Sequence, residues 1–161
     1  MRVKRISKWL SESELTIHLI DENILQWLFE NESITQKISA DGVFKLEVIK
    51  DGMGWASLDD YRAINIFPRP IRIREVRLLR DNQAVVYAKS IIPVLTSRYG
   101  YPGLEAIGSQ PLGELIFQSE LFLKQGCKFA KFTFNNQDTV WGRRTNYLVN
   151  KYPFSIMEVF L

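Results

Sequence analysis

The end of the chain, Trp141–Leu161, carries the feature that most constrains the fold. Two apolar runs of β-favouring residues flank a break at residues 150–153, and this pattern is typical of a β-hairpin. Alternate residues of a strand point to the same face, so four side chains of the second run lie together. These are Phe154, Ile156, Glu158 and Phe160.

Glu158 is the unusual member of this set, because glutamate is rarely buried without a partner. Its charged form is disfavoured among large apolar side chains unless a cation lies nearby. Two interpretations are open. Glu158 lies at a sheet edge or in a structural ion pair, which is the commoner case. Alternatively, it lines a buried cavity and binds or reacts with a polar group there.

Helix signals occur at two places in the chain. Residues 21–39 combine an apolar stripe with Asp21 as a possible N-cap, and Ser33 can cap a second short helix that runs through Ile38. Pro111 starts another helix, PLGELIFQ, because proline is tolerated in the first turn. We therefore expect short helices both before and within a mainly β chain.

Strand signals fill most of the remaining sequence. Residues 42–52 read as a strand, and residues 53–70 as a loop or flap with a short strand piece that could cover a site. Residues 71–93 form the clearest hairpin, and a further hairpin joins 127–134 to 140–149 around NNQD. Helices followed by mostly adjacent antiparallel strands predict an α+β fold, with helices packed on one face of a single antiparallel sheet.

Composition bounds the class of protein. A chain of 161 residues with 46% hydrophobic and 24% charged residues suits one globular domain, residues 1–161. A net charge of +3 is too weak and too scattered to predict nucleic-acid binding, but it is compatible with attracting a small dianion. No apolar run approaches the roughly 18 residues of a membrane span. We expect a monomer without nucleic-acid partners.

The chain has one cysteine, Cys127, and one histidine, His18. A single cysteine excludes an internal disulfide and fits the reducing cytoplasm, where we expect the protein to be. So few ligands disfavour a zinc site, and a Ser–His or Cys–His nucleophile would need His18, whose surroundings carry no further signal. There is no glycine-rich phosphate loop either. We therefore expect neither a metal nor a cofactor.

Five sequence blocks together resemble one known family, bacterial chorismate lyase, from about Ile24 to Leu161. Each block is weak alone, but their order and spacing are fairly specific. The blocks are REVRLL (74–79), YAKSIIPV (87–94), QPLGELIF (110–117), WGRR (141–144) and EVFL (158–161). The family releases pyruvate from chorismate to give 4-hydroxybenzoate for ubiquinone biosynthesis. The resemblance implies a six-stranded antiparallel sheet and a buried site closed by helical flaps.

The resemblance also implies site residues. Arg74 matches the arginine that binds the ligand carboxylate, and Glu158 matches the glutamate that meets the ring-oxygen side of the ligand. Leu112 matches a leucine that contributes through its backbone. Ile34 stands where the family has a methionine, which is harmless for a backbone contact but alters the pocket if the thioether matters. Glu158 would act either as a proton donor to the ether oxygen or by positioning alone.

Without the family resemblance, the sequence gives weaker support for a site role of its arginines. Period-two reading leaves both faces of residues 71–79 mixed, so it does not show whether Arg74 is buried, and a solvated charge is the commoner case. Its planar fork nevertheless suits a carboxylate. Arg143 and Arg144 could steer a dianion, but a basic pair in a hairpin is more often only solvated.

A non-catalytic binding protein is the alternative function. The fold that the resemblance implies also serves as the small-molecule-binding domain of some bacterial transcription regulators, which carry a winged-helix domain of their own. Too few residues precede Ile24 for such a domain, so we expect the enzyme. Fold sharing alone does not decide activity.

Overall fold

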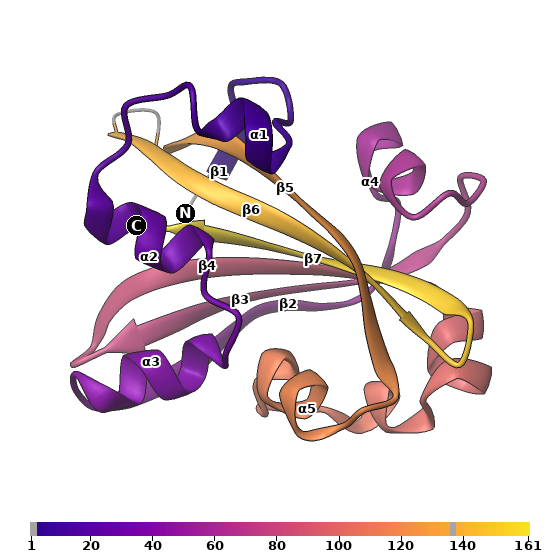
Figure 1. Cartoon of the computed structure of the whole chain (residues 1–161). Coiled ribbons are helices and arrows are strands. Elements are labelled where there is room, and N and C mark those ends of the chain that lie inside the picture. The colour runs from indigo at the N-terminus through magenta and orange to yellow at the C-terminus, as the bar shows by residue number, and fades with distance from the viewer. Residues whose placement is uncertain (1–2, 136–137) are drawn as a thin grey trace.

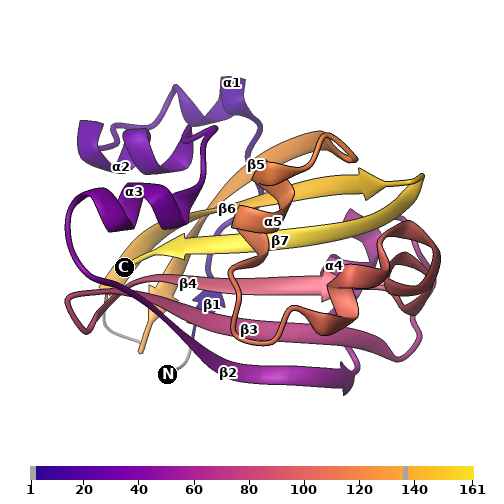
Figure 2. The same ribbon diagram turned by 90° about the horizontal axis from the view of Figure 1, so that it is seen from below.

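The computed structural model describes residues 3–135 and 138–161. In this part of the chain, seven strands form one curled antiparallel sheet in the spatial order β1-β5-β6-β7-β4-β3-β2 (Figures 1 and 2). The strands are β1 (Val3–Arg5), β2 (Phe44–Gly54), β3 (Ile71–Arg80), β4 (Gln83–Ile92), β5 (Phe122–Phe134), β6 (Asp138–Val149) and β7 (Tyr152–Phe160). The α+β prediction is confirmed, with one strand more than the expected six. The shortest strand is β1, which pairs with β5 at the sheet edge.

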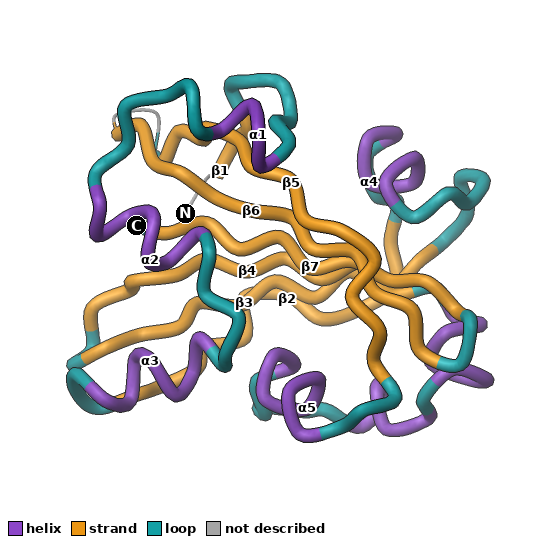
Figure 3. The backbone as a smooth tube through the Cα atoms, in the orientation of Figure 1, coloured by secondary structure: helices purple, strands orange, loops and turns teal. Residues whose placement is uncertain are grey.

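Seven short helices connect or cover these strands within the described residues (Figure 3). They are α1 (Glu12–Leu15), α2 (Glu22–Leu28), α3 (Ile34–Ala40), α4 (Leu58–Ala63), the π-helix η1 (Thr96–Gly100), the 3-10 helix η2 (Pro102–Ala106) and α5 (Leu112–Gln118). None of them is long and apolar enough to cross a membrane.

Two hairpins close with two-residue turns, as their sequences indicate. Asn150 and Lys151 join β6 to β7 with φ of 47° and 70°, and Asp81 and Asn82 join β3 to β4 with φ of 50° and 65°. Consecutive residues in the left-handed region match the right-handed twist of paired strands. The C-terminal hairpin and the 71–93 hairpin are therefore confirmed. The hairpin of β5 and β6 is also present, although residues 136–137 of its turn lie outside the described residues.

The predicted helix starts are confirmed by their caps. The Asp21 side chain accepts a hydrogen bond from the Asn23 backbone N–H at 2.8 Å, at the start of α2. The Ser33 hydroxyl accepts from the Gln36 backbone N–H at 3.3 Å, at the start of α3. Each cap satisfies a donor that the first helical turn leaves unpaired.

Residues 53–70 contain the predicted short strand piece and loop, but they also form a helix, and the prediction that they cover the site is wrong. β2 runs into this segment, and helix α4 follows because Ser57 and Asp60 form a capping box. Tyr61 and other buried residues of the segment pack against the Ile71 side of β3. Consecutive residues of a strand point to opposite faces, so α4 covers the face opposite to Arg74. The helices therefore lie on both faces of the sheet, not on one.

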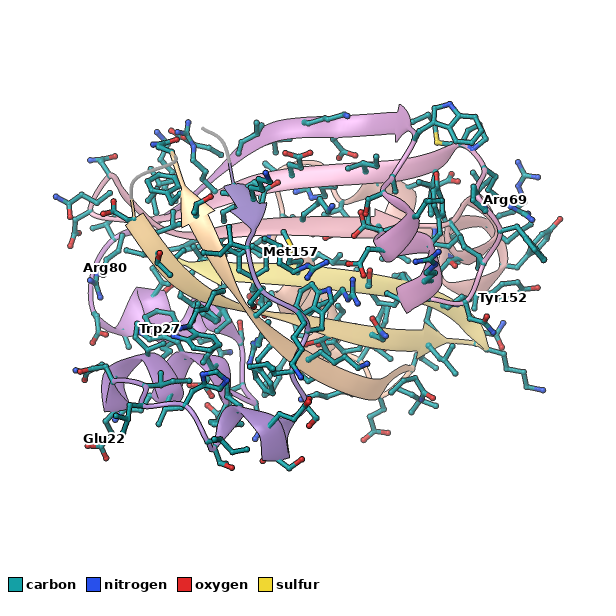
Figure 4. The ribbon with its side chains drawn as sticks, turned by 90° about the horizontal axis from the view of Figure 1, so that it is seen from above. Glu22, Trp27, Arg69, Arg80, Tyr152 and Met157 are labelled. Atoms are coloured by element: carbon teal, nitrogen blue, oxygen red, sulfur yellow. The ribbon has the colours of Figure 1, made fainter. Side chains whose placement is uncertain are left out.

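Two views show these faces. From below, α3 and α5 lie over one face of the sheet (Figure 2). Figure 4 looks onto the other face, where Met157 of β7 lies near the middle of the sheet. Its neighbour Glu158 therefore points towards the α3 and α5 side. The apolar core follows the same division, since the buried residues of α3 and α5 pack with the Glu158 face of the strands.

Candidate active site

The four residues expected from the resemblance line one small cavity between the sheet and its helical cover. Ile34 comes from the start of α3, Arg74 from β3, Leu112 from the start of α5, and Glu158 from β7. The remaining wall is mostly apolar, from Leu46, Val76, Leu78, Ala88 and Ile156. The sheet thus supplies the floor, and the first turns of α3 and α5 supply the cover.

Arg74 is buried, with 2% of its surface exposed. Its Nη1 donates to Asp51 Oδ2 at 2.8 Å and to the Gly108 carbonyl at 2.7 Å, and its Nη2 donates to the Gln110 carbonyl at 3.1 Å. The residues that precede α5 therefore hold the guanidinium in place. Periodicity left the burial of Arg74 open, and the structure shows it buried because partners from distant parts of the chain satisfy its charge.

Asp51 of β2 binds two arginines at once. Its carboxylate accepts from Arg72 at 2.7 and 2.9 Å as well as from Arg74. The hydrogen bond from Arg72, followed by that from Arg74, outweighs burial and holds the pKa of Asp51 below its ordinary value. Asp51 therefore stays ionised and fixes the arginine beside the cavity.

Part of the Arg74 fork remains available to a ligand. A guanidinium has five N–H donors, and three are used by the bonds to Asp51, Gly108 and Gln110. No other hydrogen bond to Arg74 occurs among the described residues, which leaves Nε–H and one N–H of the neighbouring Nη2. Two neighbouring donors suit one carboxylate in a bidentate contact.

Glu158 is held by an arginine that lies directly across the hairpin. The register of β6 and β7 pairs Glu158 with Arg143, and Arg143 Nε donates to Glu158 Oε2 at 2.6 Å. The Nη1 of Arg143 donates to the carbonyls of Leu28 at 3.2 Å and Glu30 at 2.5 Å. Burial works against the charge of Arg143, but the nearby Glu158 outweighs it and raises the pKa of Arg143. Glu158 is therefore ion-paired and also lines a cavity, and its binding of a polar ligand there stays a prediction.

Arg143 and Arg144 are buried as well, in contrast to the solvated side chains that are more common for a basic pair in a hairpin. Each has 7% of its surface exposed, and the two point to opposite faces of the sheet. Arg144 donates to Asp59 at 2.8 Å and lies 4.2 Å from the centre of the Trp9 ring, on the α4 side. Arg143 alone belongs to the candidate site. The sequence contained a signal for it, because a two-residue turn at 150–151 pairs position 143 with position 158.

A second, larger cavity adjoins the first. Its volume is about 520 Å³, against about 40 Å³ for the smaller one. The two share four wall residues, namely Ile34, Gly113, Ile156 and Glu158. Pockets for small molecules usually measure about 300–1,000 Å³, so the smaller cavity must widen to admit one. Helices α3 and α5 cover the smaller cavity, and no residue of the 53–70 segment lines it.

The remaining singled-out residues lie outside this site. His18 packs edge-on against Trp141, with ring centres 5.7 Å apart. Cys127 is half-buried and accepts a hydrogen bond from the Thr145 hydroxyl at 3.6 Å, and burial raises the pKa of its thiol. Within the described residues there is no cluster of His, Cys, Asp or Glu side chains that could hold a metal ion.

Comparison with known proteins identifies the family of the chain. Residues 4–161 match the chorismate lyase family. A probable chorismate pyruvate-lyase of Psychromonas ingrahamii is 30% identical over 169 residues, covering 96% of this chain and 91% of that protein. Another from Pseudomonas putida is 30% identical over 162 residues, covering 95% and 87%.

Solved structures support the fold. A possible transcriptional regulator of Bacillus subtilis has a TM-score of 0.55 at 12% identity, covering 75% of this chain and 59% of its own. At that identity the likeness concerns the fold alone. The family match extends over nearly the whole chain. The chain therefore belongs to the chorismate lyase family.

Proposed function

We propose that this protein is a chorismate pyruvate-lyase, which converts chorismate into 4-hydroxybenzoate and pyruvate. One observation carries the proposal: the four residues that match the family's ligand-binding positions come from distant parts of the chain and line one cavity. The names of its relatives support the same reaction.

In this proposal, the ring of the substrate lies against the apolar wall of the smaller cavity. Its carboxylate binds the free Nε–H and Nη2–H of Arg74, and its oxygen-bearing side meets Glu158. The fixed guanidinium supports this pose, because Asp51 and two carbonyls already hold it before the ligand arrives. A donor that is oriented beforehand loses little entropy on binding.

The reaction itself requires few protein groups. The bond between the ring and the ether oxygen breaks, and the adjacent ring carbon that bears the hydroxyl group loses its hydrogen. The departing enolpyruvyl group gains a hydrogen at its methylene carbon and leaves as pyruvate. The ring becomes aromatic, so the driving force lies in the substrate. The protein then has to hold a reactive conformer and stabilise developing charge.

The ion pair with Arg143 supports a positioning role for Glu158. The Oε2 atom of Glu158 already accepts a hydrogen bond from Arg143 Nε at 2.6 Å, so this oxygen is held in place by the arginine. The Oε1 atom of Glu158 makes no hydrogen bond to any described residue, and Glu158 lines both cavities. We therefore propose that Glu158 orients the ring hydroxyl as an acceptor while hydrogen transfer occurs within the substrate.

The finer biological setting follows from the product. We propose that 4-hydroxybenzoate made here enters ubiquinone biosynthesis, and that the protein works in the cytoplasm as a monomer. Size-exclusion chromatography with light scattering checks the last point, and a molar mass near 18.8 kDa is the expected result.

The decisive test is incubation with chorismate. Purified protein should produce 4-hydroxybenzoate and pyruvate in equal amounts, measured by chromatography of the aromatic acid and a coupled assay of the keto acid. Protein-free chorismate corrects for spontaneous decay. Arg74→Ala should be much slower than Arg144→Ala, whose side chain lies on the other face of the sheet.

A non-catalytic binder of aromatic carboxylates is the second candidate, and the enclosed cavity is the observation that favours it. Such a protein would bind 4-hydroxybenzoate in calorimetry but leave chorismate unchanged beyond its spontaneous decay. That pair of results would replace the enzyme with the binder.

We also predict that activity needs no metal ion, because the wall of the smaller cavity offers a single carboxylate and neither histidine nor cysteine. Exhaustive dialysis against a chelator should leave the turnover rate unchanged. A loss of activity that added metal ion restores would contradict the prediction.

A further inference from the structure

The larger cavity begins where the smaller one ends, at Glu158. It lies between residues 30–34, helix α5 and the strands β6 and β7. A ring held in the smaller cavity with its carboxylate at Arg74 presents its oxygen-bearing side to Glu158. A side arm attached on that side has room only in the larger cavity.

One buried cation faces this space. Arg143 lines the larger cavity with 7% of its surface exposed, whereas Lys124, the other cation of the wall, is exposed. The acidic residues of the wall are Glu30, Glu32, Glu120 and Glu158. Glu30 is paired with Lys37 at 2.9 Å, and Glu158 with Arg143. Glu32 and Glu120 are exposed, so an anion in the inner part of the cavity meets Arg143 first.

Arg143 has donors to spare. Its Nε is used by Glu158, and its Nη1 by the carbonyls of Leu28 and Glu30. The Nη2 atom of Arg143 makes no hydrogen bond to a described residue. It also keeps some exposed surface. Its two N–H groups therefore remain accessible from the cavity. Tyr147 lines the same cavity, and burial raises its pKa to about 12, so its hydroxyl stays neutral.

We propose that the larger cavity is a subsite for the second carboxylate of a dicarboxylate ligand, and that Arg143 Nη2 binds it. This rests on the proposed function, in which the substrate carries one carboxylate on its ring and another on its enolpyruvyl arm. Arg74 and Arg143 then bind the two ends, with Glu158 between them. Arg143 is thereby a specificity-determining residue that distinguishes the substrate from ring acids without a charged arm.

The test compares two stable ligands that differ only in the charge of the arm. 3-(Carboxymethoxy)-4-hydroxybenzoate carries the second carboxylate and cannot eliminate pyruvate, and its arm carboxamide is the neutral counterpart. Calorimetry on the parent protein should show tighter binding of the acid than of the amide. In Arg143→Gln the acid-to-amide affinity ratio should fall by about tenfold to a hundredfold, the usual effect of losing a hydrogen bond to a charged group.

Matched variants separate this role from a structural one. Arg144→Gln removes an equally buried arginine on the other face and should keep the parent ratio. Arg143→Lys should restore part of it, because a point charge lacks the guanidinium fork. If Arg143→Gln does not fold, the Arg143→Gln/Glu158→Gln double variant, which leaves no buried charge unpaired, is compared with Glu158→Gln.

Three outcomes overturn the subsite. They are equal parent affinities for acid and amide, an equal loss of both in Arg143→Gln, and a ratio that falls in Lys124→Gln instead. Because these measurements involve no turnover, they fail independently of the proposed reaction. A parent that prefers the acid but leaves chorismate unchanged disproves the lyase and keeps the subsite. A parent that converts chorismate but binds the acid and the amide equally supports the lyase and disproves the subsite.

Discussion

The burial of the charged side chains on this sheet depends on partners that are distant in the sequence. Arg74, Arg143 and Arg144 are all buried, and each is satisfied by groups far away in the sequence, such as Asp51 and the Glu30 carbonyl. Period-two reading left β3 ambiguous because helices cover both faces of the sheet, so both faces of this strand are buried and mixed. The family resemblance predicts a site role for Arg74, whereas the residues alone favour a solvated side chain.

Arg74→Ala should weaken binding of 4-hydroxybenzoate by about tenfold to a hundredfold, since hydrogen bonds to charged groups contribute about 1.5–3 kcal/mol. Arg74→Lys should recover only part of the affinity, because a lysine cannot present two neighbouring donors. Arg72→Ala is the matched control, since Arg72 shares Asp51 but does not line the cavity. Equal losses in Arg72→Ala and Arg74→Ala would mean that Asp51, and not the ligand, explains the effect.

Glu158→Gln should keep most of the turnover rate if the carboxylate only positions the ring. A general acid would instead contribute about 10² to 10⁴ in rate, and the glutamine variant would lose that factor. The substitution leaves Arg143 without its carboxylate, and breaking a buried pair costs about 3–5 kcal/mol of stability. Urea unfolding must therefore accompany the kinetics, and rates are compared only at a temperature where both proteins are folded.

At the scale of elements, local signals predicted most of the sheet. The hairpin turns and the caps of α2 and α3 are encoded by residues within four positions of one another, so the sequence displays them. The sequence does not predict helix α4, because its capping box uses Asp60 in place of glutamate or glutamine and because burial of Tyr61 against β3 contributes to its stability. The burial of Tyr61 is a tertiary contact, which no local sequence pattern predicts.

The pairing of β2 with β3 should depend on acid pH through Asp51. Its pKa is lowered in the folded protein, chiefly by Arg72, so its contribution to stability is complete above the ordinary aspartate value of about 3.9. That contribution is lost as the pH falls through the lowered folded pKa. Asp51→Asn should therefore flatten the fall in unfolding free energy below about pH 4.

The measurement is urea unfolding at a series of pH values between neutrality and strong acid. Asp41→Asn is the matched control, because its contact with Arg80 is 3.8 Å long and exposed, and such pairs contribute little. Identical acid profiles for parent and Asp51→Asn would show that the carboxylate does not link these strands in solution.

At the scale of the whole molecule, the closed cavity predicts slow opening of its cover. Because the smaller cavity measures about 40 Å³ and α3 and α5 cover it, we expect product to leave when one of these helices moves. If that motion is slower than the chemical step, a burst of one equivalent of 4-hydroxybenzoate should precede a slower steady rate in stopped-flow measurements. Raising the solvent viscosity should then slow the steady phase more than the burst. A linear time course from the first turnover would count against a limiting opening step.

The short turn at Asn150 and Lys151 should tolerate substitutions and insertions differently. Replacing either residue alters local backbone strain and leaves the hairpin in register. Inserting one residue is a different matter, because side chains alternate with a period of two and a one-residue slip sends each of them to the other face. Glu158 would then leave Arg143 for the α4 side, and Met157 would enter the cavity. This turn can therefore vary in composition, whereas a change in its length that shifts the register would separate Glu158 from Arg143.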